Sequence, residues 1–82
     1  MFELSAHAIE QAELRQIRHD QIFETLEKPD IIIDEGNGHV VYQKVENEGN
    51  GKSYLYRVFV NSNKNPKLVK TVYRTSKIEK YL

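Results

Sequence analysis

The sequence predicts an α+β fold in which two amino-terminal helices pack on one face of a four-stranded antiparallel meander sheet. Three observations predict it. Apolar residues follow a helical spacing before Pro29 and an alternating, strand-like spacing from Asp30 onward. The connections between the expected strands are too short for crossover helices. The chain of 82 residues has room for one thin core, so we expect a single domain over residues 1–82.

The first expected helix covers residues 6–16. Ser5 is a favourable N-cap residue, because its hydroxyl can accept a hydrogen bond from a free backbone N–H in the first turn. Ile9, Ala12 and Ile17 recur at helical spacing. These three residues therefore predict the side of the helix that is buried.

The second expected helix is short. Asp20 is expected to cap it, and Pro29 stops it. Its apolar stripe consists of Ile22, Phe23 and Leu26. Together the two helices are expected to form one α-hairpin.

Four strands are expected to follow. The first two form a hairpin around the Gly36–Gly38 turn, and looser turns rich in Gly, Asn and Pro separate the others. The expected strands cover residues 31–33, 39–45, 53–60 and 67–75.

Alternation along the strands decides which side chains converge. On the last strand, one face is expected to carry Leu68, Lys70, Val72 and Arg74, and the other Val69, Thr71, Tyr73 and Thr75. On the preceding strand, Arg57 interrupts an apolar face between Leu55 and Phe59. Two interpretations of this cation remain open: an ion pair with a helix carboxylate such as Glu10 or Glu24, or a preorganised cation at the base of a cleft.

The end of the last strand concentrates groups that bind phosphate. The hydroxyls of Tyr73, Thr75 and Ser76 alternate there with the cations Arg74 and Lys77. Such a mixture can hold an anionic oxygen from several sides.

Charge is divided unevenly along the chain. Residues 1–50 contain four Lys and Arg and eleven Asp and Glu, a net charge of −7, whereas residues 51–82 contain eight Lys and Arg and one Glu, a net charge of +7. Either acidic helices neutralise a basic sheet, or the last strands present a basic surface to a polyanion. The overall neutrality argues against tight non-specific binding of nucleic acid.

Short motifs along nearly the whole chain carry a family resemblance. They are Leu4-Ser5-x-His7-Ala8, Arg15-x-Ile17, Leu26-x-x-Pro29-Asp30, Tyr42-x-Lys44, Tyr56-Arg57-Val58 and Val72-Tyr73-Arg74-Thr75-Ser76-Lys77. With these motifs the chain resembles a family of small bacterial domains of unknown function that is grouped with the RelE/ParE-like toxins and other metal-independent ribonuclease folds. Relatives carry an arginine one helical turn after the histidine, where this chain has Gln11.

The resemblance implies cleavage of RNA by attack of a 2′-hydroxyl on the adjacent phosphorus, with no cofactor. This reaction needs a base, an acid and cations that stabilise the growing charge. His7 is the candidate base, because an unperturbed histidine has a pKa of about 6.5. Lys77 or Tyr73 would protonate the leaving oxygen. The candidate phosphate-binding cations are Arg57, Arg74 and Arg15, the last of which shares a helix side with His7.

Further residues are candidates for binding the substrate. These are Tyr42, Lys44, Thr75 and Ser76. Tyr42, Tyr56 and Tyr73 either stack a splayed base or are half-buried sheet residues.

A second function stays open beside the ribonuclease or toxin. A non-catalytic module with the same fold would bind nucleic acid or an acidic protein partner through its basic carboxy-terminal strands, having lost catalysis with the change at Gln11. The resemblance also implies an antitoxin or immunity protein as partner. The chain is expected to be a monomer or a homodimer, and the strand at residues 31–33 is a candidate edge for pairing.

Composition narrows the setting. The chain has no cysteine, which excludes disulfide and thiolate chemistry and favours a reducing cytoplasm. The start of the sequence lacks the pattern of a signal peptide, and no segment approaches transmembrane length, so no membrane partner is expected. His7, His19 and His39 are not at metal-ligand spacing, so no metal site is expected.

Overall fold

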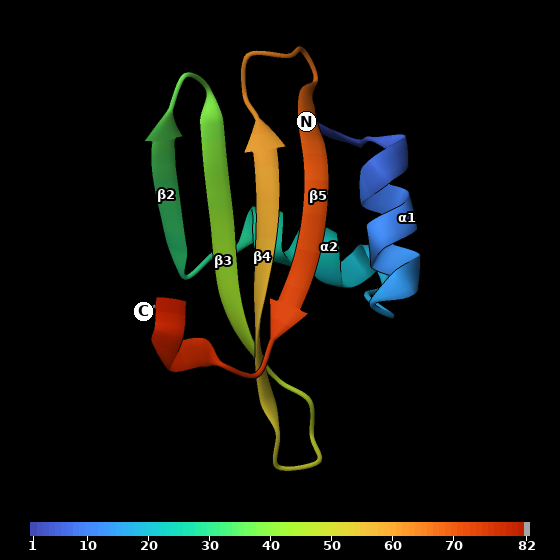
Figure 1. The fold of residues 1–82 in the computed structure, drawn as a ribbon, viewed down its shortest axis with the longest axis vertical. Helices are drawn as coiled ribbons and strands as arrows, with labels where there is room; N and C mark the ends of the chain where they lie inside the picture. Colours follow the sequence, from blue (N-terminus) through green and yellow to red (C-terminus); the bar gives the residue numbers. More distant parts are fainter. Residues whose placement is uncertain (82) are drawn as a thin grey trace.

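A mixed five-stranded sheet and two helices form the fold of the computed structural model, which describes residues 1–81 (Figure 1). The order of strands across the sheet is β1-β5-β4-β3-β2. The strands are β1 (Phe2–Leu4), β2 (Ile31–Gly36), β3 (His39–Asn47), β4 (Ser53–Asn61) and β5 (Lys67–Thr75). The predicted α+β class with two amino-terminal helices is confirmed.

The predicted sheet of four antiparallel strands was wrong in one respect. Strands β2 to β5 form the expected antiparallel meander, but β1 adds a fifth strand, which runs parallel to β5. Three residues are too few to show a period of two in the sequence. Phe2 pairs with Lys67, so this strand depends on a partner at the other end of the chain.

Helix α1 (Ala6–Leu14) is tied to β5 at its first turn. The Ser5 hydroxyl accepts a hydrogen bond from the Ala8 backbone N–H at 3.0 Å, as predicted for an N-cap. The same hydroxyl donates to the carbonyl of Lys70 at 3.0 Å. The helix ends at Leu14, two residues earlier than expected, and Gln16 adopts a positive φ of 56° that no helical residue can have.

Helix α2 (His19–Glu27) has Arg18 at its N-cap position, so the prediction that Asp20 caps this helix was wrong. The Gln21 side chain accepts a hydrogen bond from the Arg18 backbone N–H at 2.9 Å and satisfies this donor at the start of the helix. Asp20 lies inside the first turn, where its carboxylate accepts from Arg18 Nε at 3.1 Å. A negative charge at this position also suits the helix dipole.

Both helices pack on the same face of the sheet. Figure 1 shows α2 behind the strands and α1 beside β5. The core between the helices and the sheet contains Ala8, Ala12, Ile17, Ile22, Leu26, Tyr56, Val58, Val60, Val69 and Val72. Ile9 and Phe23, which we expected in this core, are 40% and 37% exposed. The small side chains of Ala8 and Ala12 face the sheet instead and allow a close approach of α1 to β5.

A β-bulge in β5 overturns part of the predicted alternation. Phe59 pairs with Thr71, but the next residue, Val60, pairs with Val69, so Lys70 is an extra residue. Val69 and Val72 therefore both point into the core, although we expected them on opposite faces. Beyond the bulge the expected alternation holds, and Tyr73 points away from the helices.

The other face of the sheet, which α1 and α2 leave uncovered, is called the open face below. After β5 the chain makes a single turn of 3-10 helix, η1 (Ile78–Tyr81), which the sequence did not predict. Figure 1 shows η1 at the lower left, below β2 and beside the lower part of β3. Within residues 1–81, no helix is long and apolar enough to cross a membrane.

Candidate functional site

Arg57 lies at the centre of the open face, on the central strand β4. Its Nε donates a hydrogen bond to Gln43 Oε1 at 2.6 Å, and its Nη1 donates to the Tyr73 hydroxyl at 2.7 Å. Gln43 and Tyr73 are the residues directly opposite Arg57 on β3 and β5. The register of three strands therefore fixes the orientation of the guanidinium group.

Three aromatic rings surround this guanidinium group. Its central carbon lies 4.4 Å from the ring centroid of Tyr81, 5.1 Å from that of Phe59 and 5.7 Å from that of Tyr73. Phe59 and Tyr73 stack with centroids 5.7 Å apart, and Tyr81 meets Tyr73 edge to face at 6.3 Å. We call Gln43, Arg57, Phe59, Tyr73 and Tyr81 the Arg57 cluster. The rings attract the cation but do not neutralise it.

Arg57 has no carboxylate partner among residues 1–81. The ion pairs in this part of the chain are Arg18–Asp20 and Arg74–Glu48. The predicted alternative of a pair with Glu10 or Glu24 is therefore wrong, because both helices lie on the opposite face of the sheet. The charge on Arg57 stays available for an anion.

The Gln43 side chain has a hydrogen-bond donor without an acceptor among residues 1–81. Its side chain is 1% exposed, and its Oε1 is already used by Arg57. Its Nε2 is buried and finds no acceptor within the described residues. A buried donor without a partner costs about 1–3 kcal/mol. The Arg57 cluster thus lacks both an anion and a hydrogen-bond acceptor.

Arg15 brings a second cation to this region from the end of α1. Its guanidinium carbon lies 5.8 Å from the centroid of the Tyr73 ring. The Gln11 side chain holds it, since Arg15 Nε donates to Gln11 Oε1 at 3.1 Å. Gln11 therefore helps to position Arg15.

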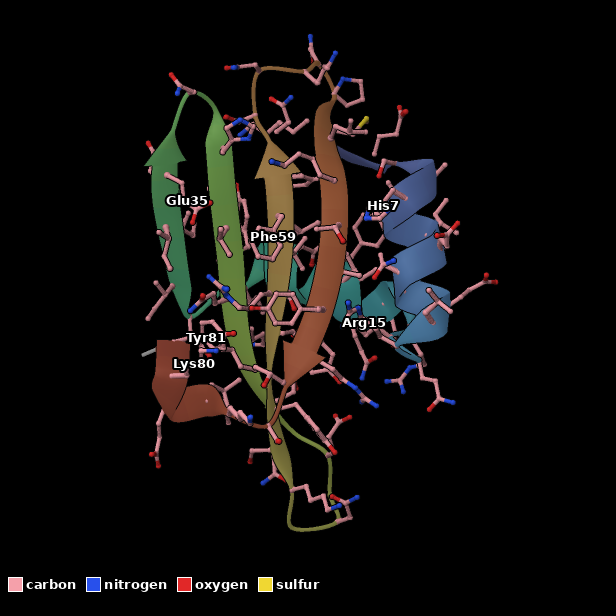
Figure 2. All side chains as sticks on the ribbon, in the orientation of Figure 1. His7, Arg15, Glu35, Phe59, Lys80 and Tyr81 are labelled. Atoms are coloured by element: carbon pink, nitrogen blue, oxygen red, sulfur yellow. The ribbon has the colours of Figure 1, made fainter. Side chains whose placement is uncertain are left out.

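His7 lies on the same helix, about 12 Å from Arg15 along the helix axis. Figure 2 shows the side chains of His7 and Arg15 on the side of α1 that borders β5. His7 is exposed to solvent. The structure therefore places His7, Arg15 and Tyr73 along the boundary between α1 and β5, and Tyr73 joins this boundary to Arg57.

Arg74 lies on the other face of the sheet. Its Nη1 donates to Glu48 Oε1 at 3.2 Å, and its guanidinium carbon lies 4.7 Å from the Tyr54 ring centroid. The hydroxyl of Tyr56 links this pair to α2, because it donates to Glu48 and accepts from Gln21 Nε2, both at 3.0 Å. The hydrogen bond to Tyr56 is the main cause of a raised pKa for Arg74. Arg74 therefore joins the sheet to its helix side and does not meet Arg57.

The remaining predicted residues lie on β3 and at or just after the end of β5. Tyr42 packs edge to face against Phe2 at 5.7 Å, and Lys44 Nζ donates to the carbonyl of Lys28 at 3.0 Å. After β5, the Lys77 backbone N–H donates to the Thr75 hydroxyl at 3.0 Å, which turns the chain toward η1. The exposed side chains of Ser76 and Lys77 lie in this turn.

The hydroxyl of Tyr73 is suited to hold a proton. Burial raises the pKa of Tyr73, the contact with Tyr81 raises it further, and the Arg57 guanidinium opposes this shift. The phenol is therefore protonated at neutral pH. It can serve as a proton donor but not as a base.

Sequence reasoning missed Gln43 and Tyr81. Gln43 was visible as a polar residue within an apolar strand, but only the strand register places it opposite Arg57. Tyr81 lies beyond the last strand, and nothing in the sequence indicates that the chain folds back over the sheet. Among residues 1–81, no cluster of three or more His, Asp or Glu side chains could hold a metal ion.

Comparison with known proteins gives one finding. A family model described as Domain of unknown function (DUF4258) matches residues 4–74, from the end of β1 nearly to the end of β5. No curated protein and no solved structure gives a match. The match agrees with the predicted domain-of-unknown-function family and carries no link to the RelE/ParE-like toxins. Because the match spans most of the chain, the protein belongs to the DUF4258 family.

Proposed function

We propose that the open face binds single-stranded RNA at the Arg57 cluster, and that the domain cleaves this RNA in the manner of the RelE-like ribonucleases. One observation carries the proposal: Arg57 is a half-buried cation that is held by two neutral side chains, surrounded by aromatic rings and free of any carboxylate partner in residues 1–81. Proteins that bind single-stranded RNA combine cations for the phosphates with rings that stack on the bases.

The proposed reaction forms a bond between the 2′-oxygen and phosphorus and breaks the bond between phosphorus and the 5′-oxygen. Tyr73 gives its proton to the leaving 5′-oxygen, and water takes the proton of the 2′-hydroxyl. His7 is left out because it lies about 12 Å along the helix from Arg15, the residue that meets the Tyr73 ring. Arg57 and Arg15 stabilise the charge on the phosphoryl oxygens. The products are a 2′,3′-cyclic phosphate and a 5′-hydroxyl.

This mechanism uses part of the residue set that the sequence suggested. Arg74 is left out because it faces the helix side, where it pairs with Glu48. Lys77 is left out because it lies in the turn that follows β5. Tyr73 is kept as the acid because its hydroxyl lies 2.7 Å from Arg57 Nη1, at the centre of the site.

The test is cleavage of a short RNA by the purified protein in the presence of a chelator, with analysis of the product ends. We expect 2′,3′-cyclic phosphate ends, and a loss of at least about 100-fold in rate for Arg57→Gln, which removes the charge at the centre of the site. Lys64→Gln is the matched control, because it removes one exposed cation from the β4–β5 loop. Absence of cleavage by the wild type, or equal rates for wild type and Arg57→Gln, would remove the catalytic proposal.

A second function has its own support. Arg74 faces the helix side, where it pairs with Glu48, and position 11 carries a glutamine where the resemblance implies an arginine. A site with fewer cations suits a module that binds RNA or an acidic protein, such as an antitoxin or immunity partner, without cleaving anything. Binding of RNA that is recovered intact, and lost in Arg57→Gln, would favour this function.

A further inference from the structure

We infer that the position of the Tyr81 ring over Arg57 is a nucleobase-binding subsite, which Tyr81 itself fills in the free protein. The inference rests on the proposed binding of RNA and adds the place where a base docks. It assigns Tyr81 the role of an internal occupant that the ligand displaces.

The Tyr81 ring covers the Arg57 guanidinium group at a distance that a base could also take. The centroid of the Tyr81 ring lies 4.4 Å from the guanidinium carbon, closer than the centroid of either other ring in the cluster. Planar guanidinium groups stack on the faces of aromatic rings and on unpaired RNA bases in the same way. Phe59 and Tyr73 belong to strands and are fixed by the sheet, whereas Tyr81 belongs to a single turn outside it.

The turn that carries Tyr81 is held weakly. All four residues of η1 are at least partly exposed, and Glu79 and Lys80 are exposed. Figure 2 shows Tyr81 and Lys80 together at the edge of the open face. A short turn with little buried apolar surface can move away at small cost in free energy.

Gln43 indicates that a ligand at this position should provide a hydrogen-bond acceptor, which Tyr81 does not provide. Its buried Nε2 has no acceptor in residues 1–81, although Tyr81 lies over the neighbouring Arg57. The edge of a nucleobase carries carbonyl oxygens or ring nitrogens that accept hydrogen bonds, next to a face that stacks. The attached phosphate would supply the anion that Arg57 lacks. One nucleotide thus meets all three demands of the site: a planar ring, an acceptor and a negative charge.

The test measures binding without cleavage. The probe is a fluorescently labelled RNA pentamer with 2′-O-methyl groups, which lacks the attacking hydroxyl, and the readout is anisotropy at fixed salt. We expect Tyr81→Ala to bind it about 3-fold to 30-fold more tightly than the wild type, because the internal competitor is gone. Tyr81→Phe keeps the ring and should bind like the wild type. A pentamer of abasic sugar-phosphate units should gain nothing from Tyr81→Ala.

A second readout follows the Gln43 side chain directly. The NMR signals of its Nε2 hydrogens should shift when the pentamer binds and stay unchanged with the abasic chain. Equal or weaker binding by Tyr81→Ala, an equal gain with the abasic chain, or no binding by any form would overturn the inference. These outcomes do not depend on cleavage, so a protein that binds as expected but leaves natural RNA intact would refute catalysis alone.

Discussion

The substitution Gln43→Glu tests whether the Arg57 cluster is an anion site that is left incomplete. A carboxylate of nearly the same shape would stand opposite Arg57, where the present amide oxygen accepts from Nε at 2.6 Å. It would satisfy the guanidinium from within the protein. The variant should therefore be more stable and should lose its affinity for RNA.

The expected magnitude follows from three contributions. Replacing a neutral acceptor by a charged one strengthens the hydrogen bond by roughly 1 kcal/mol, and removing the unpaired Nε2 donor removes a cost of about 1–3 kcal/mol. Because Gln43 is buried, the new carboxylate loses its hydration, and this cost of a few kcal/mol offsets part of these gains. We expect a net gain of about 1 kcal/mol at pH 7, which corresponds to a rise in Tm of roughly 4–8 °C for a domain of this size.

The assays are thermal unfolding at two pH values and anisotropy with the 2′-O-methyl pentamer. The Arg57 guanidinium would lower the pKa of the introduced carboxyl, so the added stability should be present at pH 7 and lost as the pH falls through that lowered pKa. RNA affinity should fall at least tenfold. Gln43→Met is the control, because it removes the partner of Arg57 without adding charge. A variant Gln43→Glu that is less stable than the wild type at pH 7 and binds RNA equally well would refute the reasoning.

Two further predictions concern the helix side of the sheet. Glu48→Gln should lower stability by about 1 kcal/mol in urea unfolding, because it removes the charge that pairs with the partly buried Arg74 at 3.2 Å, and it should leave RNA binding unchanged. Burial raises the pKa of Tyr56, so the native state holds this proton more tightly than the unfolded chain, and stability should decline as the pH rises above 10. In a pH series of urea unfolding, the free energy of unfolding of Tyr56→Phe should decline less steeply above pH 10 than that of the wild type. An identical slope would show that Tyr56 does not cause the decline.

Local signals in the sequence were sufficient to predict the order of most elements. The strand at residues 67–75 has the predicted bounds, and Ser5 caps α1 as expected. Both signals are carried by neighbouring residues, namely an alternating pattern that ends in polar residues and a hydroxyl before an apolar run. The predicted opposition of Tyr73 and Arg74 on β5 is also seen, since strand alternation requires it.

The features that the sequence did not predict depend on contacts between distant residues. Strand β1 depends on the pairing of Phe2 with Lys67, and the bulge at Lys70 accompanies the burial of Val69 in the core. A pattern with a period of two contains no sign of an inserted residue. The alternation therefore placed Val69 on the wrong face.

The candidate site could be predicted only in part for the same reason. The isolated cation among apolar residues pointed to Arg57, and one of the two interpretations of it, a preorganised cation, is consistent with its contacts. Its partner Gln43 required the register of β3 against β4, and Tyr81 required the path of the chain after β5. A sequence shows which residues are unusual for their surroundings, but register and chain path decide which of them meet.

The most direct test of the central claim is an NMR titration of the protein with the 2′-O-methyl pentamer. We predict the largest changes in chemical shift at Arg57 Nε, at the Gln43 side chain and along the open face of β4 and β5, with little change in α2. Changes confined to α2 and the Arg74–Glu48 pair, on the opposite face of the sheet, would contradict the claim that the Arg57 cluster binds RNA.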